Sequence, residues 1–221
     1  MFSLNVAGGE AGVDTIDLET AAMHHVMEIG LANTIKHKTE LPCGAVATRG
    51  AVMIGKGVPT DFRLMQDPLH AEFNAGASAR LDPTYRPVNV YDSEGKVVAG
   101  PPDTFRVGFE PCDNCQDWLA TQPGIKRVAF ILSRVDLANK GLVKPHPETI
   151  FERVERLGFP YTVEQLQDEE LRGIGLSILD HVQRNPKTEV VTIKADPLKA
   201  ILSNLRRKPV STVLLPARRF A

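Results

Sequence analysis

Two short runs of this 221-residue chain place potential metal ligands beside an acidic side chain. They are His70-Ala71-Glu72 and Pro111-Cys112-Asp113-Asn114-Cys115. On a helix, Cys112 and Cys115 lie about one turn apart, so both sulfur atoms can reach one ion. His70 and Glu72 would instead point about 200° from each other, at roughly 100° per residue. The spacing therefore predicts that His70 and the two cysteines bind one metal and that Glu72 does not.

The ligand types favour zinc in a catalytic site. Three protein ligands leave tetrahedral zinc one open position for water, whereas structural zinc sites are closed by four protein ligands. Pro111 and Asp113 indicate that the second run begins a helix, with Pro111 at its first position. The positive end of that helix favours thiolate over thiol. With three cysteines in the chain, no Cys₄ site can form, and a thioredoxin-type pair would leave the histidine run without a role.

The remaining histidines and the third cysteine are interpreted as structural residues. This group comprises His24, His25, His37, His146, His181 and Cys43. Cys43 is expected to be a small buried side chain rather than a nucleophile.

Composition is typical of a globular protein, with 43% hydrophobic and 24% charged residues. The low cysteine content favours a reducing cytoplasm. Residues 1–13 lack a basic start followed by an apolar run, and no stretch approaches about 18 consecutive apolar residues, so we expect neither secretion nor a membrane span. We expect a flexible N-terminus (residues 1–14), a catalytic domain (15–185) and a C-terminal extension with a basic tail (186–221).

Helices and strands are predicted to alternate along the chain. The predicted helices cover residues 18–38, 70–80, 147–157 and a late stretch ending near 184, and the predicted strands cover 45–48, 52–54, 105–109, 127–133 and 160–163. This order predicts an α/β fold, a three-layer α/β/α sandwich around a five-stranded mixed sheet. Both metal runs would begin helices that follow strands, where open α/β sheets bind ligands.

The two runs together resemble the H-x-E…P-C-x-x-C signature of zinc deaminases. Further segments resemble the cytidine deaminase-like superfamily, most closely its branch of tRNA adenosine deaminases and guanine deaminases. These are Cys43-Gly44-Ala45-Val46, Phe109-Glu110-Pro111-Cys112 and Phe159-Pro160-Tyr161-Thr162-Val163. The resemblance implies a fifth strand parallel to the fourth and a homodimer. It implies that a nucleobase-type heterocycle is converted to a carbonyl product with release of ammonia, with Glu72 as proton shuttle and the backbone N–H of Ala71 as a substrate contact.

Three features depart from that branch. Gly57-Val58-Pro59-Thr60 replaces its usual Gly-Trp-Asn, which leaves Thr60 as a candidate substrate contact. Residues 88–98 indicate an added hairpin, open to interpretation as a lid, an interface or a plain surface insertion. After residue 184, a strand over 188–194 and a helix over 197–207 are expected. The basic residues there could bind phosphate or simply stabilise the helix end and the solvated terminus; they are Lys199, Arg206, Arg207, Lys208, Arg218 and Arg219.

Three classes of function fit these observations: a small-molecule enzyme, a nucleic-acid deaminase and a catalytically silent zinc-binding partner subunit. The presence of Glu72 disfavours the silent partner. A net charge of −1, a pI near 6.6, one tryptophan and three tyrosines disfavour a nucleic-acid groove. We therefore predict a zinc enzyme acting on a small molecule.

Overall fold

The computed structural model describes residues 15–37, 41–60, 70–185 and 191–207. Its helices are α1 (Thr15–His37), α2 (Ala71–Arg80), α3 (Asp113–Thr121), α4 (Arg134–Asn139), α5 (Ile150–Leu157), α6 (Glu169–Leu179) and α7 (Ala195–Arg207). Its strands are β1 (Ala45–Arg49), β2 (Val52–Gly57), β3 (Val90–Tyr91), β4 (Val97–Ala99), β5 (Thr104–Phe109), β6 (Arg127–Leu132), β7 (Thr162–Gln165), β8 (Val182–Arg184) and β9 (Val191–Ile193). Within these residues, no helix has the length and apolar character needed to cross a membrane.

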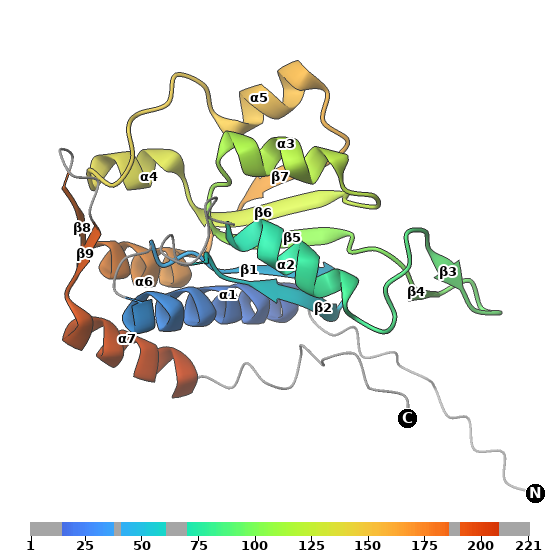
Figure 1. Ribbon diagram of the computed structural model, residues 1–221, viewed down its shortest axis with the longest axis horizontal. Helices are drawn as coiled ribbons and strands as arrows, with labels where there is room; N and C mark the ends of the chain where they lie inside the picture. Colours follow the sequence, from blue (N-terminus) through green and yellow to red (C-terminus); the bar gives the residue numbers. More distant parts are fainter. Residues whose placement is uncertain (1–14, 38–40, 61–69, 186–190, 208–221) are drawn as a thin grey trace, which may run out of the picture.

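The central sheet has five strands in the order β2-β1-β5-β6-β7. Strand β1 is antiparallel to both β2 and β5, whereas β5, β6 and β7 run parallel (Figure 1). The mixed sheet and the parallel fifth strand confirm the fold predicted from the sequence.

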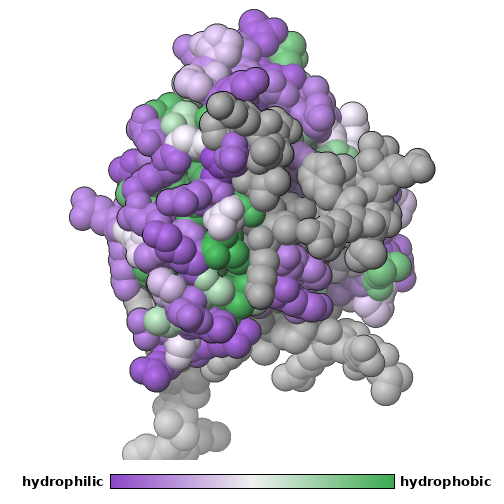
Figure 2. All heavy atoms as spheres, turned by 60° about the vertical axis from the view of Figure 1, so that its left-hand side comes forward, coloured by the Kyte–Doolittle hydropathy of each residue, from purple (hydrophilic) through white to green (hydrophobic). Residues whose placement is uncertain are grey.

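Helices cover both faces of this sheet. Alternation along β1 sends Val46 to one face and Ala45 and Ala47 to the other. Helices α1 and α6 cover the Val46 face, and α2 and α3 cover the other (Figure 1). Strands β5 and β6 are buried almost throughout, as expected for parallel strands enclosed on both faces. Outside the core, the face of the molecule in Figure 2 is mostly polar.

Several predicted boundaries were wrong, and local capping explains them. Helix α5 begins at Ile150 rather than at Pro147, because Thr149 and Glu152 form a capping box. The late helix ends at Leu179, and residues 182–184 instead form β8, which pairs with β9. Helix α4 was not predicted; it begins after Ser133, which forms a second capping box.

The predicted hairpin within residues 88–98 is present as β3 and β4. Asp92 accepts hydrogen bonds from two backbone N–H groups in its turn, and Gly95 has a φ of 78° there. The side chain of Arg49 connects the hairpin to β1, because it donates hydrogen bonds to the carbonyl oxygens of Thr84 and Gly100. The hairpin extends away from the sheet (Figure 1).

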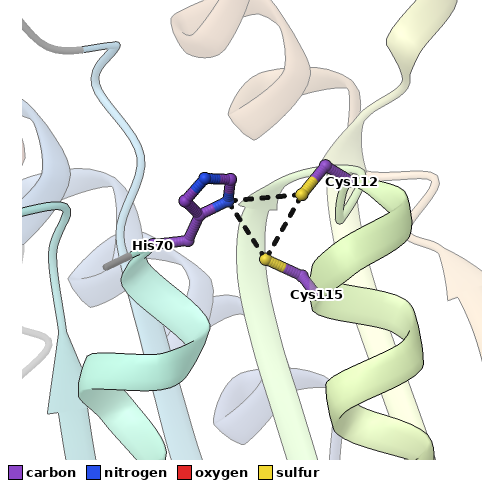
Figure 3. A group of neighbouring side chains, drawn as sticks. All are labelled: His70, Cys112 and Cys115. Atoms are coloured by element: carbon purple, nitrogen blue, oxygen red, sulfur yellow. Dashed lines mark hydrogen bonds between the residues drawn. The ribbon is translucent and has the colours of Figure 1, made fainter. Parts of the chain in front are cut away.

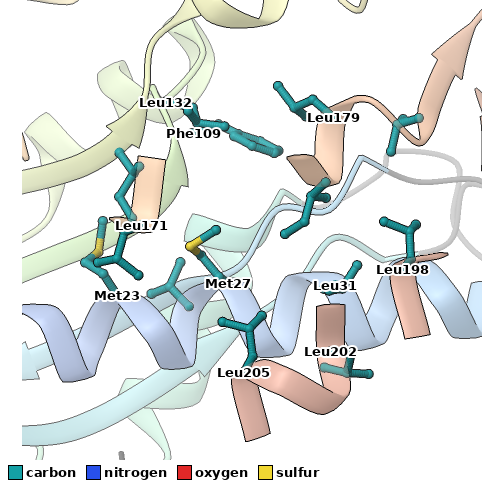
Figure 4. Packing of buried hydrophobic residues seen from close by; sticks show 14 of the residues in the cluster. Met23, Met27, Leu31, Phe109, Leu132, Leu171, Leu179, Leu198, Leu202 and Leu205 are labelled. Carbon is teal, nitrogen blue, oxygen red and sulfur yellow. The ribbon is translucent and has the colours of Figure 1, made fainter. Parts of the chain in front are cut away.

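The C-terminal helix α7 packs on α1 and contributes to the main core. Leu198, Leu202 and Leu205 belong to the buried cluster that includes Met23 and Met27 of α1 (Figure 4). The predicted strand and helix after residue 184 are therefore confirmed as β9 and α7, and α7 is held by apolar burial.

The basic residues of α7 largely face acidic partners. Lys199 lies 3.0 Å from Asp196, and Arg206 lies 3.1 Å from Glu28 of α1. Arg206 and Arg207 are in the last turn, where the helix dipole favours positive charge. These contacts favour the helix-stabilising interpretation for the part of the tail that the structure describes. Lys208, Arg218 and Arg219 lie outside the described residues.

Truncating Leu198, which is fully buried, should destabilise the whole protein if α7 is part of its core. We expect Leu198→Ala to lower the free energy of unfolding by about 3 kcal/mol. Ser203→Ala, at an exposed position of the same helix, is the control. Denaturant unfolding measures both, and equal midpoints for the two variants would contradict this assignment.

A buried ion pair ties α1 to the sheet. Arg106 of β5 is 4% exposed and donates to both carboxylate oxygens of Glu19, while Arg127 also contacts that carboxylate at 2.9 Å. Burial alone would raise the pKa of Glu19, but the hydrogen bonds and charges of the two arginines outweigh it and lower that pKa.

Stability should consequently depend on pH through Glu19. The folded-state pKa is below the usual value of 4.5, so its contribution is complete above that value and is lost as pH falls through the folded-state pKa. We expect Glu19→Gln to lower the free energy of unfolding by about 3 kcal/mol at neutral pH, and by much less at acidic pH. Urea unfolding from pH 3 to 7 tests this, with Glu94→Gln at the exposed hairpin turn as control. A pH-independent difference would contradict the assignment.

Candidate metal centre

Helix α2 lies directly on β2 because small residues face each other across the contact. A Cβ atom at Gly57 would lie 2.2 Å from the Ala71 carbonyl oxygen, and one at Gly55 would lie 2.3 Å from that of Ala75. Ala71 and Ala75 are fully buried on the facing side of α2. This backbone contact sets where α2 begins.

Three side chains converge between the starts of α2 and α3 (Figure 3). The Nδ1 atom of His70 lies 3.2 Å from the sulfur atoms of both Cys112 and Cys115, and the two sulfur atoms are 3.5 Å apart. These three residues form a group whose ligand atoms could hold one metal ion, and Glu72 is not a member of it. The structure thus brings together the three predicted ligands.

His70 and Cys112 both occupy helix N-cap positions, each with extended backbone and without a side-chain capping hydrogen bond. His70 and Pro111 were predicted to be the first residues of these helices. This was wrong, because α2 begins one residue after His70 and α3 begins two residues after Pro111. The difference matters, because an N-cap side chain leaves the helix and can turn toward a neighbouring helix. Both helix N-termini therefore place their positive dipole ends near the metal group.

The hydrogen bond between the two cysteines favours the thiolate form of Cys112 and raises the pKa of Cys115. The pKa of Cys112 is lowered to about 4, first by a hydrogen bond from the Cys115 thiol and further by one from His70. Thiolate is the form of cysteine that binds metals. A histidine and two cysteines in this arrangement fit zinc, with room for one further ligand.

Glu72 and Ala71 lie beside the group, in the first turn of α2. Glu72 is 3% exposed, and burial raises the pKa of its carboxyl group. Its carboxylate interacts with the Cys115 thiol. The backbone N–H of Ala71 belongs to the first turn, where N–H groups have no partner within the helix. Both residues line the same pocket as the metal group.

A pocket of about 530 Å³ opens at this point. Its described lining consists of Leu41, Cys43, Pro59, His70, Ala71, Glu72, Phe109, Glu110, Cys112, Asp113, Asn114, Arg134, Leu137, Val143, Lys144 and His146. Apolar side chains form much of this lining, which suits the faces of a heterocycle. Cys43, which the sequence predicts to be a small buried side chain, also lines this pocket and therefore lies next to the site.

The role of Thr60 as a substrate contact stays a prediction. Pro59 lines the pocket, whereas Thr60 is not among the lining residues in the described part of the chain. Two amides hold this segment: Asn33 donates to the Pro59 carbonyl at 3.2 Å, and Asn74 donates to that of Val58 at 2.7 Å.

Arg134, at the start of α4, holds residues 111–115, called here the cysteine loop, through hydrogen bonds. Its guanidinium donates to the Pro111 carbonyl at 3.1 Å and to Asp113 at 2.6 Å. The buried carboxylate of Glu110 accepts the backbone N–H of Arg134 at 2.9 Å. Gln116 donates to the same Pro111 carbonyl at 2.7 Å. The cysteine loop is therefore held by hydrogen bonds on two sides.

Asp113 connects this network to the segment before α5. It lies 3.2 Å from His146 and 3.9 Å from Arg153. Burial alone would raise the pKa of Asp113, but Arg134, His146 and Arg153 together lower it. His146, which the sequence suggested to be structural, therefore lies in the pocket wall.

Sequence reasoning did not identify Arg134, Lys144 or His146 as pocket residues. They belong to α4 and to the segment between α4 and α5, and no spacing relates them to the metal runs. The sequence offers one indication, which applies to Arg134. This residue follows the carboxyl end of a parallel strand, where α/β proteins bind ligands.

Comparison with solved structures identifies the fold. No protein-family model and no curated protein matches the sequence. A guanine deaminase from Nitrosomonas europaea is 20% identical over 72% of this chain and 81% of its own, with a TM-score of 0.50. A structure of the protein NE0047 in complex with 2,6-diaminopurine is 20% identical over 73% of this chain and 79% of its own, with a TM-score of 0.51. An NE0047 variant in complex with 8-azaguanine is 21% identical over 74% and 83%, with a TM-score of 0.53.

The chain therefore has the cytidine deaminase-like fold that its motifs predicted, and solved structures that share this fold include deaminases.

Replacing Gly57 should disturb the metal group through the backbone. We expect Gly57→Ala to displace the start of α2, because the added methyl group would meet the Ala71 carbonyl, and to weaken zinc binding at least tenfold. Gly173→Ala, where a Cβ atom meets nothing within 4 Å, is the matched control in α6. Competition with a zinc chelator measures both; wild-type affinity in Gly57→Ala would show that the contact does not position His70.

Proposed function

We propose that this protein is a zinc-dependent hydrolytic deaminase that converts an amino-substituted nucleobase-type heterocycle to its carbonyl product and releases ammonia. The observation that carries the proposal is the group of His70, Cys112 and Cys115 with the buried Glu72 beside it, outside the ligand set, at a pocket that His70, Glu72 and Cys112 line. The guanine deaminase and the purine-analogue complexes that share the fold support this reaction class.

His70, Cys112 and Cys115 would hold the zinc ion. Bound zinc acts as a Lewis acid that makes water nucleophilic at neutral pH. Glu72 accepts a proton from the attacking water and delivers protons to the ring nitrogen and the departing amine. Its burial keeps these protons away from bulk solvent, and it lies outside the group of metal ligands.

The remaining pocket residues hold the substrate. Ala71 lines the pocket at the start of α2, and its backbone N–H would donate to a polar atom of the ring. Leu41, Phe109 and Leu137 pack on the apolar faces of the heterocycle and exclude water from them. Recognition by walls of this kind orients the ring toward Glu72.

A small-molecule substrate is favoured over a nucleic acid. Lys199 and Arg206 of α7 pair with acidic residues, so they do not form an unbalanced basic surface. The solved complexes that share the fold contain free purine analogues. We also propose that the protein acts in the cytoplasm as a homodimer, the hairpin of β3 and β4 being one exposed surface available for assembly.

Removing the proton carrier should separate catalysis from metal binding. We expect Glu72→Gln to retain zinc and to lose at least a hundredfold in kcat, because a positioned acid–base group contributes about 10²–10⁴-fold. Glu155→Gln, at an exposed site of α5, controls for the loss of one negative charge. The assay measures ammonia release from bases, nucleosides, nucleotides and short RNA or DNA at low salt. Full turnover by Glu72→Gln would rule out the shuttle role.

A companion variant tests the metal group itself. Cys112→Ala should copurify with little zinc and should release no ammonia, since two protein ligands bind zinc much more weakly than three. Elemental analysis gives the metal content. Zinc at wild-type occupancy in this variant would overturn the ligand assignment.

A further inference from the structure

One wall of the pocket carries three basic side chains. Arg134 belongs to the first turn of α4, and Lys144 and His146 belong to the segment that joins α4 to α5. The sequence motifs of the metal site do not include these residues. Their charges therefore bear on what the pocket binds rather than on the metal.

Two of these basic side chains already have acidic partners. Arg134 lies 2.6 Å from Asp113 and 3.7 Å from Glu110, and His146 lies 3.2 Å from Asp113. The neighbouring Arg153 binds Asp117 through both of its terminal nitrogens. Glu110 and Asp113 thus both lie within ion-pair distance of Arg134.

Lys144 is the exception. Its exposed ammonium group has no hydrogen-bond or ion-pair partner among residues 15–37, 41–60, 70–185 and 191–207. Asn114, in the first turn of α3, also lines the pocket, and its side-chain amide has no partner in the same part of the chain. Among the described residues, the pocket lining thus offers one ammonium group without an acidic partner and one free amide donor.

Solvent exposure distinguishes these two groups from Glu72. Glu72 is 3% exposed, whereas Lys144 and Asn114 are exposed residues of the pocket lining. The volume of about 530 Å³ falls within the roughly 300–1,000 Å³ of sites that enclose whole ligands rather than single rings. A ring held beside Glu72 therefore leaves space toward the solvent for a substituent.

We propose that Lys144, assisted by the Asn114 amide, binds an anionic substituent of the substrate, a phosphate or a carboxylate attached to the heterocycle. This inference rests on the proposed deaminase function and narrows its substrate class. An ammonium group attracts either anion as a point charge, and an amide N–H adds a hydrogen bond. The pairing of Asp113 with Arg134 and His146 reduces the repulsion that this carboxylate would otherwise exert on such a substrate.

The test compares neutral and anionic forms of the same ring. Adenine, guanine and cytosine are assayed as free base, nucleoside and nucleoside 5′-monophosphate, together with cytosine-5-carboxylate, for ammonia release by the zinc-loaded protein. Binding of the corresponding product nucleosides and nucleoside monophosphates is measured by calorimetry, which needs no turnover. The variants are Lys144→Gln, Lys144→Arg and Asn114→Ala, with Lys199→Gln on α7 as the matched control for loss of one surface charge.

We expect one or both anionic forms to be preferred, and Lys144→Gln to raise KM and Kd for that form about tenfold, the effect of losing one charge-assisted contact. The same variant should leave neutral forms unchanged, and Lys144→Arg should restore most of the affinity. A smaller loss in Asn114→Ala supports the assisting role. Preference for phosphate or for carboxylate identifies the substituent.

Two results would overturn the inference: equal use of neutral and anionic forms, or equal effects of Lys144→Gln and Lys199→Gln. Absence of ammonia from every compound would count against the proposed function and not against this site. In that case calorimetry decides. Lys144-dependent binding of the nucleoside monophosphates supports the anion site, and its absence overturns it.

Discussion

The contact between β2 and α2 is the constraint on which the site depends. Two glycines on β2 face buried alanines on α2, and the backbone atoms there leave no space for a Cβ atom. A helix held this closely to a strand has little freedom to slide or rotate. The position of His70 at its start, and of Glu72 in its first turn, therefore follows from backbone packing rather than from hydrogen bonds of their own side chains.

A second constraint comes from the helix starts themselves. At most helix N-termini the N-cap side chain turns back to bond the first backbone N–H groups. His70 and Cys112 do not, and their side chains meet each other instead. The positive ends of α2 and α3 are thus left facing a group of thiol sulfur atoms, which favours the thiolate form and metal binding. His70 and Cys112 therefore do not cap their helices, and their side chains are placed where they could bind a metal.

The pocket combines a rigid floor with a charged wall drawn from other parts of the chain. The floor is set by β2, α2 and the cysteine loop, which Gln116 and Arg134 hold through the Pro111 carbonyl. The wall comes from α4 and the segment that follows it, where ion pairs centre on Asp113. The group of possible metal ligands and these ion-paired wall residues thus come from different elements of the fold.

Sequence by itself was sufficient for the metal group, because its evidence is local: His70 with Glu72, and Cys112 with Cys115, are related by spacing within single runs. It was also sufficient for the order of strands and helices, since the buried runs of β5 and β6 and the hairpin of β1 and β2 carry short-range hydrophobic and turn signals. Helix starts were misplaced where a capping box, as at Thr149, outweighed a nearby proline. What only the tertiary structure decided is the rest of the pocket. Arg134, Lys144 and His146 reach it through the packing of α4 and its following segment, and no periodicity in the sequence reports contacts between elements so far apart along the chain.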